Sequence, residues 1–198
     1  MSNYYEKFYG YTGFFPILKG KNREVSHTIE LRQILNVLPN DGGSLFSRTG
    51  LVHGARLFIL DDVIYNGHPS TAEHLEYEYL AVSLTFDGEL EGLSNQLAKV
   101  GGEEFKKIFC HCYGYDELDM KENCILKFLK AGQVTTSFLY VESDGDLQET
   151  LRALLAKRLI TEMLEQAQFL NTTDKKALVL ATAANIASAV SPLAGDFI

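Results

Sequence analysis

The sequence predicts an α+β fold, with helices packed on one face of an antiparallel sheet and a helical region at the C-terminal end. In some segments the apolar residues alternate every second position, and in others they recur every three or four positions, which are the periods of strands and helices. Turns that contain glycine separate the two kinds of segment. At 198 residues and 46% hydrophobic content, the chain is also large and apolar enough to bury a substantial core.

The first strand and the first helix are predicted near the N-terminus. The short apolar run Gly13–Leu18 favours a strand, and Pro16, which lacks an N–H donor, favours an edge strand or the start of a strand. From Glu24 to Leu38 the apolar residues recur at helical spacing, which predicts an amphipathic helix. The turn-forming residues Pro39–Gly43 then end this helix.

Two further strands follow, and a long connection joins them. Val52–Leu60 is rich in the branched and aromatic residues that favour strands, with a start near Ser44 as the alternative. The segment Asp61–Glu78 is acidic and rich in turn-forming residues, and loops of this length are uncommon unless they are functional. Tyr79–Phe86 alternates apolar with mixed positions, which predicts a strand with one fully apolar face.

A second helix and a fourth strand complete the repeat. Helical spacing continues over Glu89–Val100, and Gly101-Gly102 is expected to end that helix. Phe105–Tyr113 is interpreted as a strand that ends sharply at Gly114. The predicted order is strand, helix, strand, strand, helix, strand, which is the βαββαβ order of the ferredoxin-like fold.

The C-terminal part extends this repeat with helices and one more strand. We predict a helix over Leu118–Ala131, a strand over Val134–Val141 and a long helix from Leu147 to about Leu170. A last helix over Lys175–Val190 is almost free of charge. Its apolar part is shorter than the roughly 20 residues that span a bilayer, so we expect it to dock on the core or on a second subunit, with interfacial membrane contact as the alternative. The expected domains are residues 1–170 and an apolar helical tail, 171–198.

Composition excludes several classes of partner. Eighteen basic against 26 acidic residues give a net charge of −8, which disfavours nucleic acid and anionic membranes. The N-terminus lacks the basic stretch and apolar run of a secretory signal. The three cysteines, Cys110, Cys112 and Cys124, are too few and too clustered for a disulfide framework. We therefore expect a cytoplasmic protein.

Four stretches between His53 and Arg158 resemble a known family. They are VHGARL from Val52, followed by Asp61-Asp62; LTFDG from Leu84; HCYGY from His111; and QVTTSFLY from Gln133. The stretches are similar to those of small proteins or domains of unassigned activity, related to the dimeric α/β-barrel superfamily and often found near haem peroxidases and catalases. The resemblance covers about half of the chain.

This resemblance implies a ferredoxin-like sheet whose open face meets a partner sheet. The partner is expected to be a second subunit, hence a homo-oligomer, or an extra segment of the same chain. The wider superfamily hosts haem peroxidases, chlorite-decomposing enzymes, monooxygenases and plain ligand binders, so the fold alone does not choose a function. Haem is the cofactor that the resemblance allows, and an oxidative enzyme is the partner that it suggests.

Three residues are candidates for chemistry, because imidazole ligates iron and titrates near neutral pH, and a guanidinium on a strand needs an anion. They are His53, His111 and Arg56. Alternation along Val52–Leu60 places His53 and Arg56 on opposite faces of the strand. For Arg56 the expected anion is Asp61, Asp62 or a ligand carboxylate. The expected ligand-binding residues are Arg56, Tyr79, Ser83 and Thr85, whose mixed strand face would line the interior of a barrel.

No other pattern points to a reaction. Cys110-His111-Cys112 is a weak metal motif, because on a strand the two thiols project together while the imidazole points away. Nucleotide-binding glycine motifs, metalloprotease motifs and nucleophile elbows are missing from the sequence. The function expected from the sequence is therefore a small-molecule-binding or accessory domain that self-associates beside an oxidative enzyme. The alternatives are a haem- or oxygen-dependent oxidoreductase that uses His53 or His111, and an interaction protein that docks through its apolar C-terminal helix on a partner or a membrane.

Overall fold

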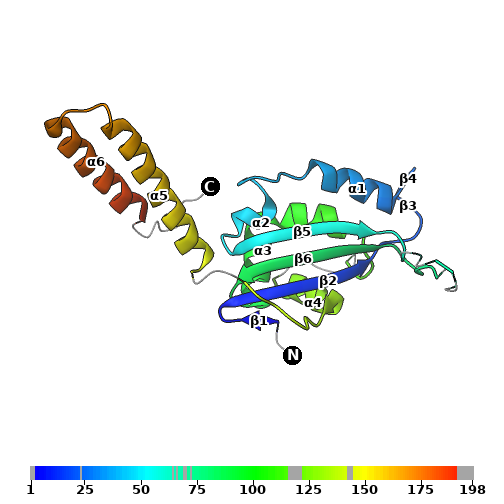
Figure 1. Cartoon of the computed structure of the whole chain (residues 1–198). Helices are drawn as coiled ribbons and strands as arrows, with labels where there is room; N and C mark the ends of the chain where they lie inside the picture. Colours follow the sequence, from blue (N-terminus) through cyan, green and yellow to red (C-terminus); the bar gives the residue numbers. More distant parts are fainter. Residues whose placement is uncertain are drawn as a thin grey trace. The chain divides into compact units, whose positions relative to one another are not determined.

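The structure, a computed structural model of the chain, describes residues 3–22, 24–63, 65, 67–68, 71, 73–115, 122–141 and 145–190 (Figure 1). The chain divides into two compact units, Met1–Glu142 and Ser143–Ile198. The long helix that was predicted to end near residue 170 therefore lies in the same unit as the C-terminal helix. The sequence instead predicts a domain boundary between these two helices, after residue 170. The predicted α+β class is confirmed.

The first unit contains a five-stranded antiparallel sheet. Its strands are β1 (Tyr4–Tyr5), β2 (Phe8–Pro16), β5 (Val52–Leu60), β6 (Tyr79–Asp87) and β7 (Gln133–Val134). The spatial order is β1-β2-β6-β5, and β7 pairs with β2 at Thr12 and Gly13, so that β1 and β7 share one edge of β2. A separate ribbon pairs β3 (Lys21–Asn22) with β4 (Val25–Ser26).

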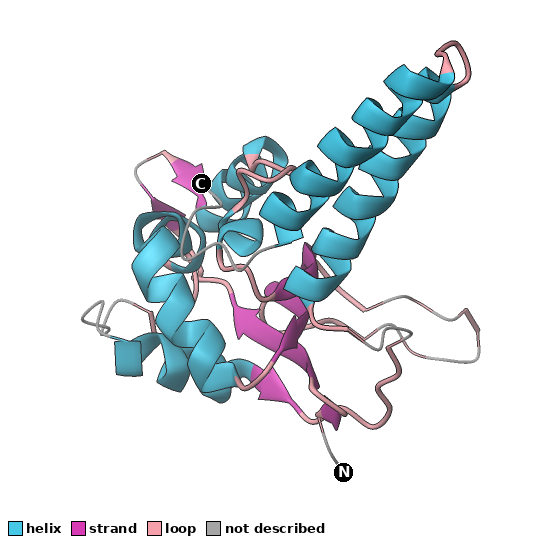
Figure 2. Ribbon diagram, turned by 90° about the vertical axis from the view of Figure 1, so that its left-hand side faces the viewer, coloured by secondary structure: helices cyan, strands magenta, loops and turns pink. Residues whose placement is uncertain are grey.

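Four helices of this unit share a core with one face of the sheet (Figure 2). They are α1 (His27–Val37), α2 (Leu45–Arg48), α3 (Leu90–Phe109) and α4 (Glu122–Gly132). Helix α1 begins where the Ser26 hydroxyl accepts the N–H of Ile29, at 3.3 Å. The core joins alternate residues of β2 and β6 to the inner faces of the helices; its sheet members include Tyr11, Phe15, Leu80, Val82, Leu84 and Phe86.

The second unit is a pair of helices, α5 (Leu147–Ala167) and α6 (Thr172–Val190). Asp146 caps α5 by accepting the N–H of Glu149 at 2.7 Å. Asn171 accepts the N–H groups of Thr173 and Asp174, each at 3.0 Å, before α6. Among the described residues, no helix combines the length and the apolar character needed to cross a membrane.

Two predicted strands are wrong. Phe105–Tyr113 belongs largely to α3, which continues to Phe109 and ends where the N–H of Cys110 bonds the carbonyl of Lys106 at 2.9 Å. The end of the segment meets the sheet through an isolated antiparallel bridge between Cys112 and Ile17 and through the N–H of Tyr113, which donates to the carbonyl of Pro16 at 2.9 Å. The predicted strand Val134–Val141 contributes only its first residue to β7.

Other elements differ in their bounds. Strand β2 begins at Phe8, five residues before the predicted start, and α3 passes through Gly101, which kinks the helix without ending it. The short helix α2 was not predicted. The first residues of the helix predicted from Leu118 lie outside the described part of the chain, where α4 begins at Glu122. Strands β5 and β6 agree with their predictions to within one residue.

Candidate functional site

One face of the sheet points away from the helical core and carries the residues expected to bind a ligand. Strand pairing arranges its side chains in rows that cross β5, β6 and β2. From one end of the sheet to the other, the rows are Gly54–Thr85–Gly10, Arg56–Ser83–Thr12, Phe58–Ala81–Phe14 and Leu60–Tyr79–Pro16. We call this surface the open face. The structure therefore brings Arg56, Tyr79, Ser83 and Thr85 to one surface, as the sequence predicts.

Arg56 and Ser83 lie directly opposite each other on this face, and both are exposed. The Arg56 guanidinium lies over the ring of Phe58, with its carbon 5.1 Å from the ring centroid. Among the described residues Arg56 forms no ion pair: Asp61 binds Arg32 instead, and Asp62 binds His74. The carboxylates expected to neutralise Arg56 are thus engaged elsewhere.

His53 lies on a different face from the one predicted. A β-bulge between Val52 and Gly54 shifts the register and breaks the simple alternation of β5. His53 consequently contacts the side chains at the end of the open face: its Nε2 is 2.8 Å from Asp87 Oδ1, and its ring is 5.0 Å from that of Phe8. The bulge therefore brings His53 to the same face as Arg56, one row further along.

His111 lies on the side of the sheet that faces the helical core. It pairs with His27, a histidine that the sequence analysis did not single out. The two Nδ1 atoms of His27 and His111 are 3.1 Å apart, so one nitrogen donates and the other accepts. His111 is 2% exposed, and its carbonyl accepts the N–H of Leu18 at 2.8 Å. Burial lowers the pKa of His111; the nearby Glu30 carboxylate opposes this effect and His27 adds to it. The net effect is a lowered pKa, which favours the neutral form of the His111 imidazole.

These contacts do not fit the expected haem arrangement. His111 is buried against His27 beside the helices, whereas Arg56 is exposed on the opposite face of the sheet. An iron bound to His111 would therefore not face Arg56. His53 shares a face with Arg56, but its Nε2 already bonds Asp87, and its side chain is 17% exposed. These residues therefore do not form the expected haem site.

The cysteines differ in environment. Cys112 is buried, and burial, together with Cys110, raises the pKa of its thiol to about 12, so that the thiol stays protonated. Cys110 Sγ is 3.6 Å from the carbonyl oxygen of Lys107. In the described part of the chain, no three side chains of histidine, cysteine, aspartate or glutamate lie together as metal ligands would.

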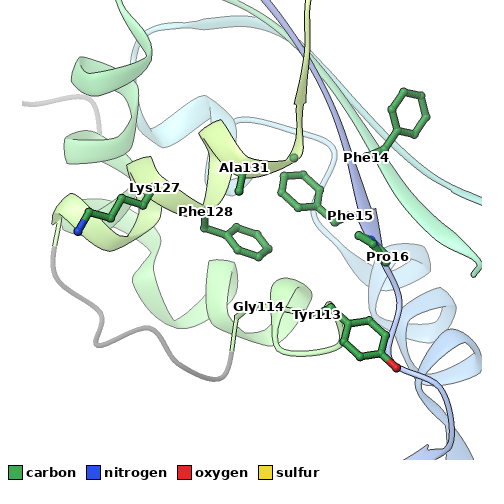
Figure 3. A pocket seen from close by; sticks show the side chains of 9 residues that line it. Phe14, Phe15, Pro16, Tyr113, Gly114, Lys127, Phe128 and Ala131 are labelled. Atoms are coloured by element: carbon green, nitrogen blue, oxygen red, sulfur yellow. The ribbon is translucent and has the colours of Figure 1, made fainter.

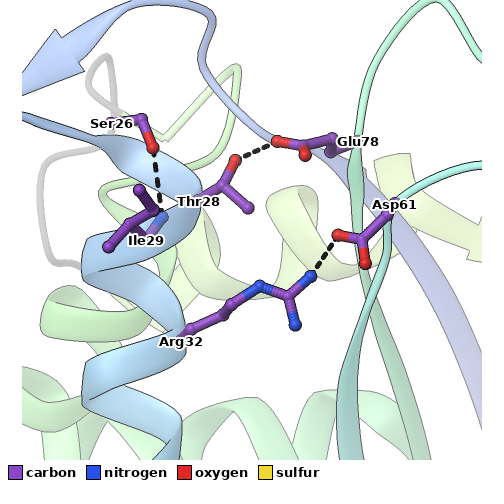
Figure 4. Close-up of polar contacts among 6 residues, drawn as sticks. All are labelled: Ser26, Thr28, Ile29, Arg32, Asp61 and Glu78. Carbon is purple, nitrogen blue, oxygen red and sulfur yellow. Dashed lines mark hydrogen bonds and ion pairs between the residues drawn. The ribbon is translucent and has the colours of Figure 1, made fainter.

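Polar contacts tie α1 to the connection before β6 (Figure 4). Thr28 donates its hydroxyl to the carboxylate of Glu78, and Arg32 binds Asp61. Within the connection, Asp62 accepts the N–H groups of Val63 and Leu75 and bonds His74. The His74 and main-chain hydrogen bonds lower the pKa of the Asp62 carboxyl to about 2. The long connection is therefore anchored at both ends.

A cavity of about 260 Å³ lies between the end of β2 and helix α4 (Figure 3). Its walls come from β2, from the turn after α3 and from the last turns of α4; they are Phe14, Phe15, Pro16, Tyr113, Gly114, Lys127, Phe128, Ala131 and Gly132. This cavity was not predicted from the sequence, because Phe15 and Phe128 are more than 100 positions apart. Comparisons with protein-family models, curated proteins and solved structures found no match to the chain.

Proposed function

We propose that this chain is a small-molecule-binding domain of the dimeric α/β-barrel type, which self-associates through its open face and acts beside an oxidative enzyme. The order β7-β2-β6-β5 supports the ferredoxin-like assignment, because in that fold the fourth strand pairs with the first and the third lies between the first and second. In this reading the two residues of β7 replace the strand predicted at Phe105–Tyr113.

The observation that carries the proposal is an apolar row on the open face. Phe58, Ala81 and Phe14 lie side by side across three strands, and Phe58 is 39% exposed. An antiparallel sheet can leave one face in water, but that face is then normally polar. An apolar row with two aromatic rings on such a face is typical of a surface that a partner covers. A second copy of the same face would cover it with an identical row.

The neighbouring row supplies the polar part of the site. Arg56, Ser83 and Thr12 offer a guanidinium and two hydroxyl groups on adjacent strands. A guanidinium binds carboxylate or phosphate groups in two-point contacts, and these contacts strengthen when water is excluded. Pairing of two open faces would exclude water from this row. An anionic small molecule is therefore the ligand that the open face favours.

The test of self-association is the Phe58→Asp substitution. Light scattering after size-exclusion chromatography, over about 1 to 100 μM protein, is expected to give a dimer for the native chain and a monomer for the variant, because the substitution removes the apolar ring and the new carboxylate, even beside Arg56, would lose its water on pairing. Val37→Asp is the matched control, since Val37 is 80% exposed on α1, away from the sheet. The proposal fails if the native chain is monomeric throughout, or if both variants lower the mass equally.

The second unit favours one other function, interaction through its helices. Among the described residues of this unit only Thr182 is buried, whereas Leu154 is 56% and Leu180 71% exposed. Two helices with so little shared core are stabilised by packing against something else. Leu180→Glu is expected to abolish such docking, with Ser188→Glu, also exposed on α6, as control. Unchanged oligomer mass and liposome binding in Leu180→Glu would exclude this function.

A further inference from the structure

The cavity between β2 and α4 has rigid aromatic walls. The rings of Phe15 and Phe128 stack with their centroids 4.6 Å apart, and Phe109 and Tyr115 contact the Phe128 ring edge-to-face at 5.4 and 5.5 Å. Figure 3 shows Phe15 and Phe128 turned toward each other, whereas Phe14 points to the other side of β2. The walls therefore belong to the core and are formed before any ligand enters.

Two contacts hold the helix at this distance from the strand. The buried hydroxyl of Tyr11 donates to the carbonyl of Leu129 at 2.7 Å, which fixes α4 against β2. Gly132 allows the close approach, because a methyl group there would overlap the ring of Phe15. The spacing of α4 and β2 beside the cavity is consequently a property of the packed fold.

The volume and the lining define the size and shape of the ligand. An apolar cavity of about 150 Å³ holds a benzene molecule, and sites for drug-sized ligands start at about 300 Å³. A volume of about 260 Å³ therefore suits one or two fused rings. Aromatic walls favour a flat aromatic ligand, which can stack on them or meet them edge-on.

Charge at the rim defines the polar group. Lys127 is the one charged residue among those that line the cavity, and none of the lining residues is acidic. Lys127 is exposed, and its ammonium group points away from Phe128 and Pro16 in Figure 3, but its flexible four-carbon side chain can turn toward a negative group at the mouth. We propose that this cavity binds a small aromatic carboxylate, with the ring between Phe128 and Pro16 and the carboxylate at Lys127. Phe14 and Pro16 of β2 border both this cavity and the open face, but the binding proposed here does not require the proposed self-association.

The test uses 2-naphthoate and its neutral counterpart 2-naphthamide with the full chain. The chain contains no tryptophan, so naphthoate fluorescence can be followed without indole emission. We expect 2-naphthoate to bind with a Kd on the order of 0.1 mM, given its small number of atoms. Lys127→Gln is expected to weaken 2-naphthoate roughly threefold to tenfold, as for a solvent-accessible ion pair, and to leave 2-naphthamide unchanged.

Matched variants separate this site from others. Lys130→Gln changes an exposed lysine on the same helix that does not line the cavity, and is expected to bind both probes as the native chain does. Ala131→Trp places an indole in the cavity from an exposed position and is expected to abolish binding of both probes. Arg56→Gln, on the open face, is expected to leave 2-naphthoate binding intact even if self-association is lost.

Three results would overturn the assignment. The first is the lack of saturable 2-naphthoate binding up to about 10 mM, a hundred times the expected Kd. The second is unchanged affinity in a folded Ala131→Trp variant, which would place the ligand elsewhere. The third is an equal effect of Lys127→Gln and Lys130→Gln on 2-naphthoate affinity, which would show that the overall positive charge of α4 attracts the ligand and that Lys127 has no specific contact.

Discussion

The buried pair of His27 and His111 predicts a loss of stability below neutral pH. His111 is neutral in the folded unit, because burial lowers its pKa, whereas in the unfolded chain it titrates near the ordinary value of 6.5. A base whose pKa is lowered by folding takes up its proton more readily when unfolded. The stability that depends on the neutral ring is therefore complete above pH 6.5 and declines as the pH falls below it.

The magnitude follows from proton linkage. One group that binds a proton only in the unfolded state lowers the free energy of unfolding by at most about 1.4 kcal/mol for each pH unit. Between about pH 6.5 and 5.5 the expected loss from His111 is therefore at most about 1.4 kcal/mol. The geometry gives the same direction: the two Nδ1 atoms share one hydrogen at 3.1 Å, and protonating both rings would place two donors face to face.

Urea denaturation at about pH 7.5, 6.5 and 5.5 measures this loss, with ΔG obtained by linear extrapolation. Near-ultraviolet circular dichroism of tyrosine is the appropriate signal, since all ten tyrosines precede residue 143 and report on the first unit alone. His111→Asn keeps a group that can hydrogen-bond His27 but removes the titration. His68→Asn, an exposed histidine of the long connection, is the control.

We expect the free energy of unfolding to fall with pH in the native chain and in His68→Asn, and this pH dependence to be missing from His111→Asn. His111→Asn is also expected to be less stable at every pH, because the smaller side chain leaves part of the buried site unfilled. The reasoning is refuted if the native unit is equally stable at all three pH values. It is also refuted if His111→Asn retains the native pH dependence, which would assign the protons to other groups.

Two further predictions concern the packing that shapes the unit, and both are measured by the same urea denaturation. Gly101→Ala is expected to destabilise the unit by about 1–3 kcal/mol, because the added methyl group would overlap the buried Leu45 side chain. Gly92→Ala, in open space on the same helix, is expected to stabilise the unit by about 0.5–1 kcal/mol. The reverse order of stability would contradict the described packing of α2 on α3. Tyr11→Phe is expected to cost about 1 kcal/mol, since it leaves the hydrogen bond to Leu129 unmade, and an unchanged midpoint would show that this bond does not hold α4.

Strands β5 and β6 were predictable because their pattern is local. In Tyr79–Asp87 every second residue is apolar and buried, so the period of two alone identifies the strand and its inner face. The same rule placed Arg56, Ser83 and Thr85 on one surface once the two strands were paired in register. It failed at His53, because one extra residue in a bulge changes the face of the side chain and leaves no clear mark in the sequence.

The segment Phe105–Tyr113 was mispredicted because residue type and residue spacing disagree. Its phenylalanine, isoleucine and cysteine residues favour strands, but Phe105, Ile108, Phe109 and Cys112 also recur at positions i, i+3, i+4 and i+7, and all four are buried. The helical spacing prevails because α3 already runs through the kink at Gly101 and packs on the sheet. The glycine pair interpreted as a helix stop only bends the helix.

The histidine pair and the cavity could not be derived from local patterns. His27 and His111 are 84 positions apart, and Phe15 meets Phe128 across most of the first unit. Nothing near His27 distinguishes it from an ordinary residue at a helix start. Such sites arise only when β2, α1, α3 and α4 are packed together, which a reading of one segment at a time cannot provide.

Strand β2 borders both proposed sites, which can nevertheless be tested separately. Phe14 and Phe15 are neighbours in the chain, yet alternation sends the first to the open face and the second to the core beside the cavity. Phe58 and Arg56 lie on β5 and do not line the cavity, whereas Lys127 and Ala131 lie on α4 and line it. Substitutions at the two pairs therefore change different surfaces, although Phe14 and Pro16 of β2 border both. Loss of self-association with intact naphthoate binding would then show two independent surfaces, whereas a joint loss would show that β2 itself had moved.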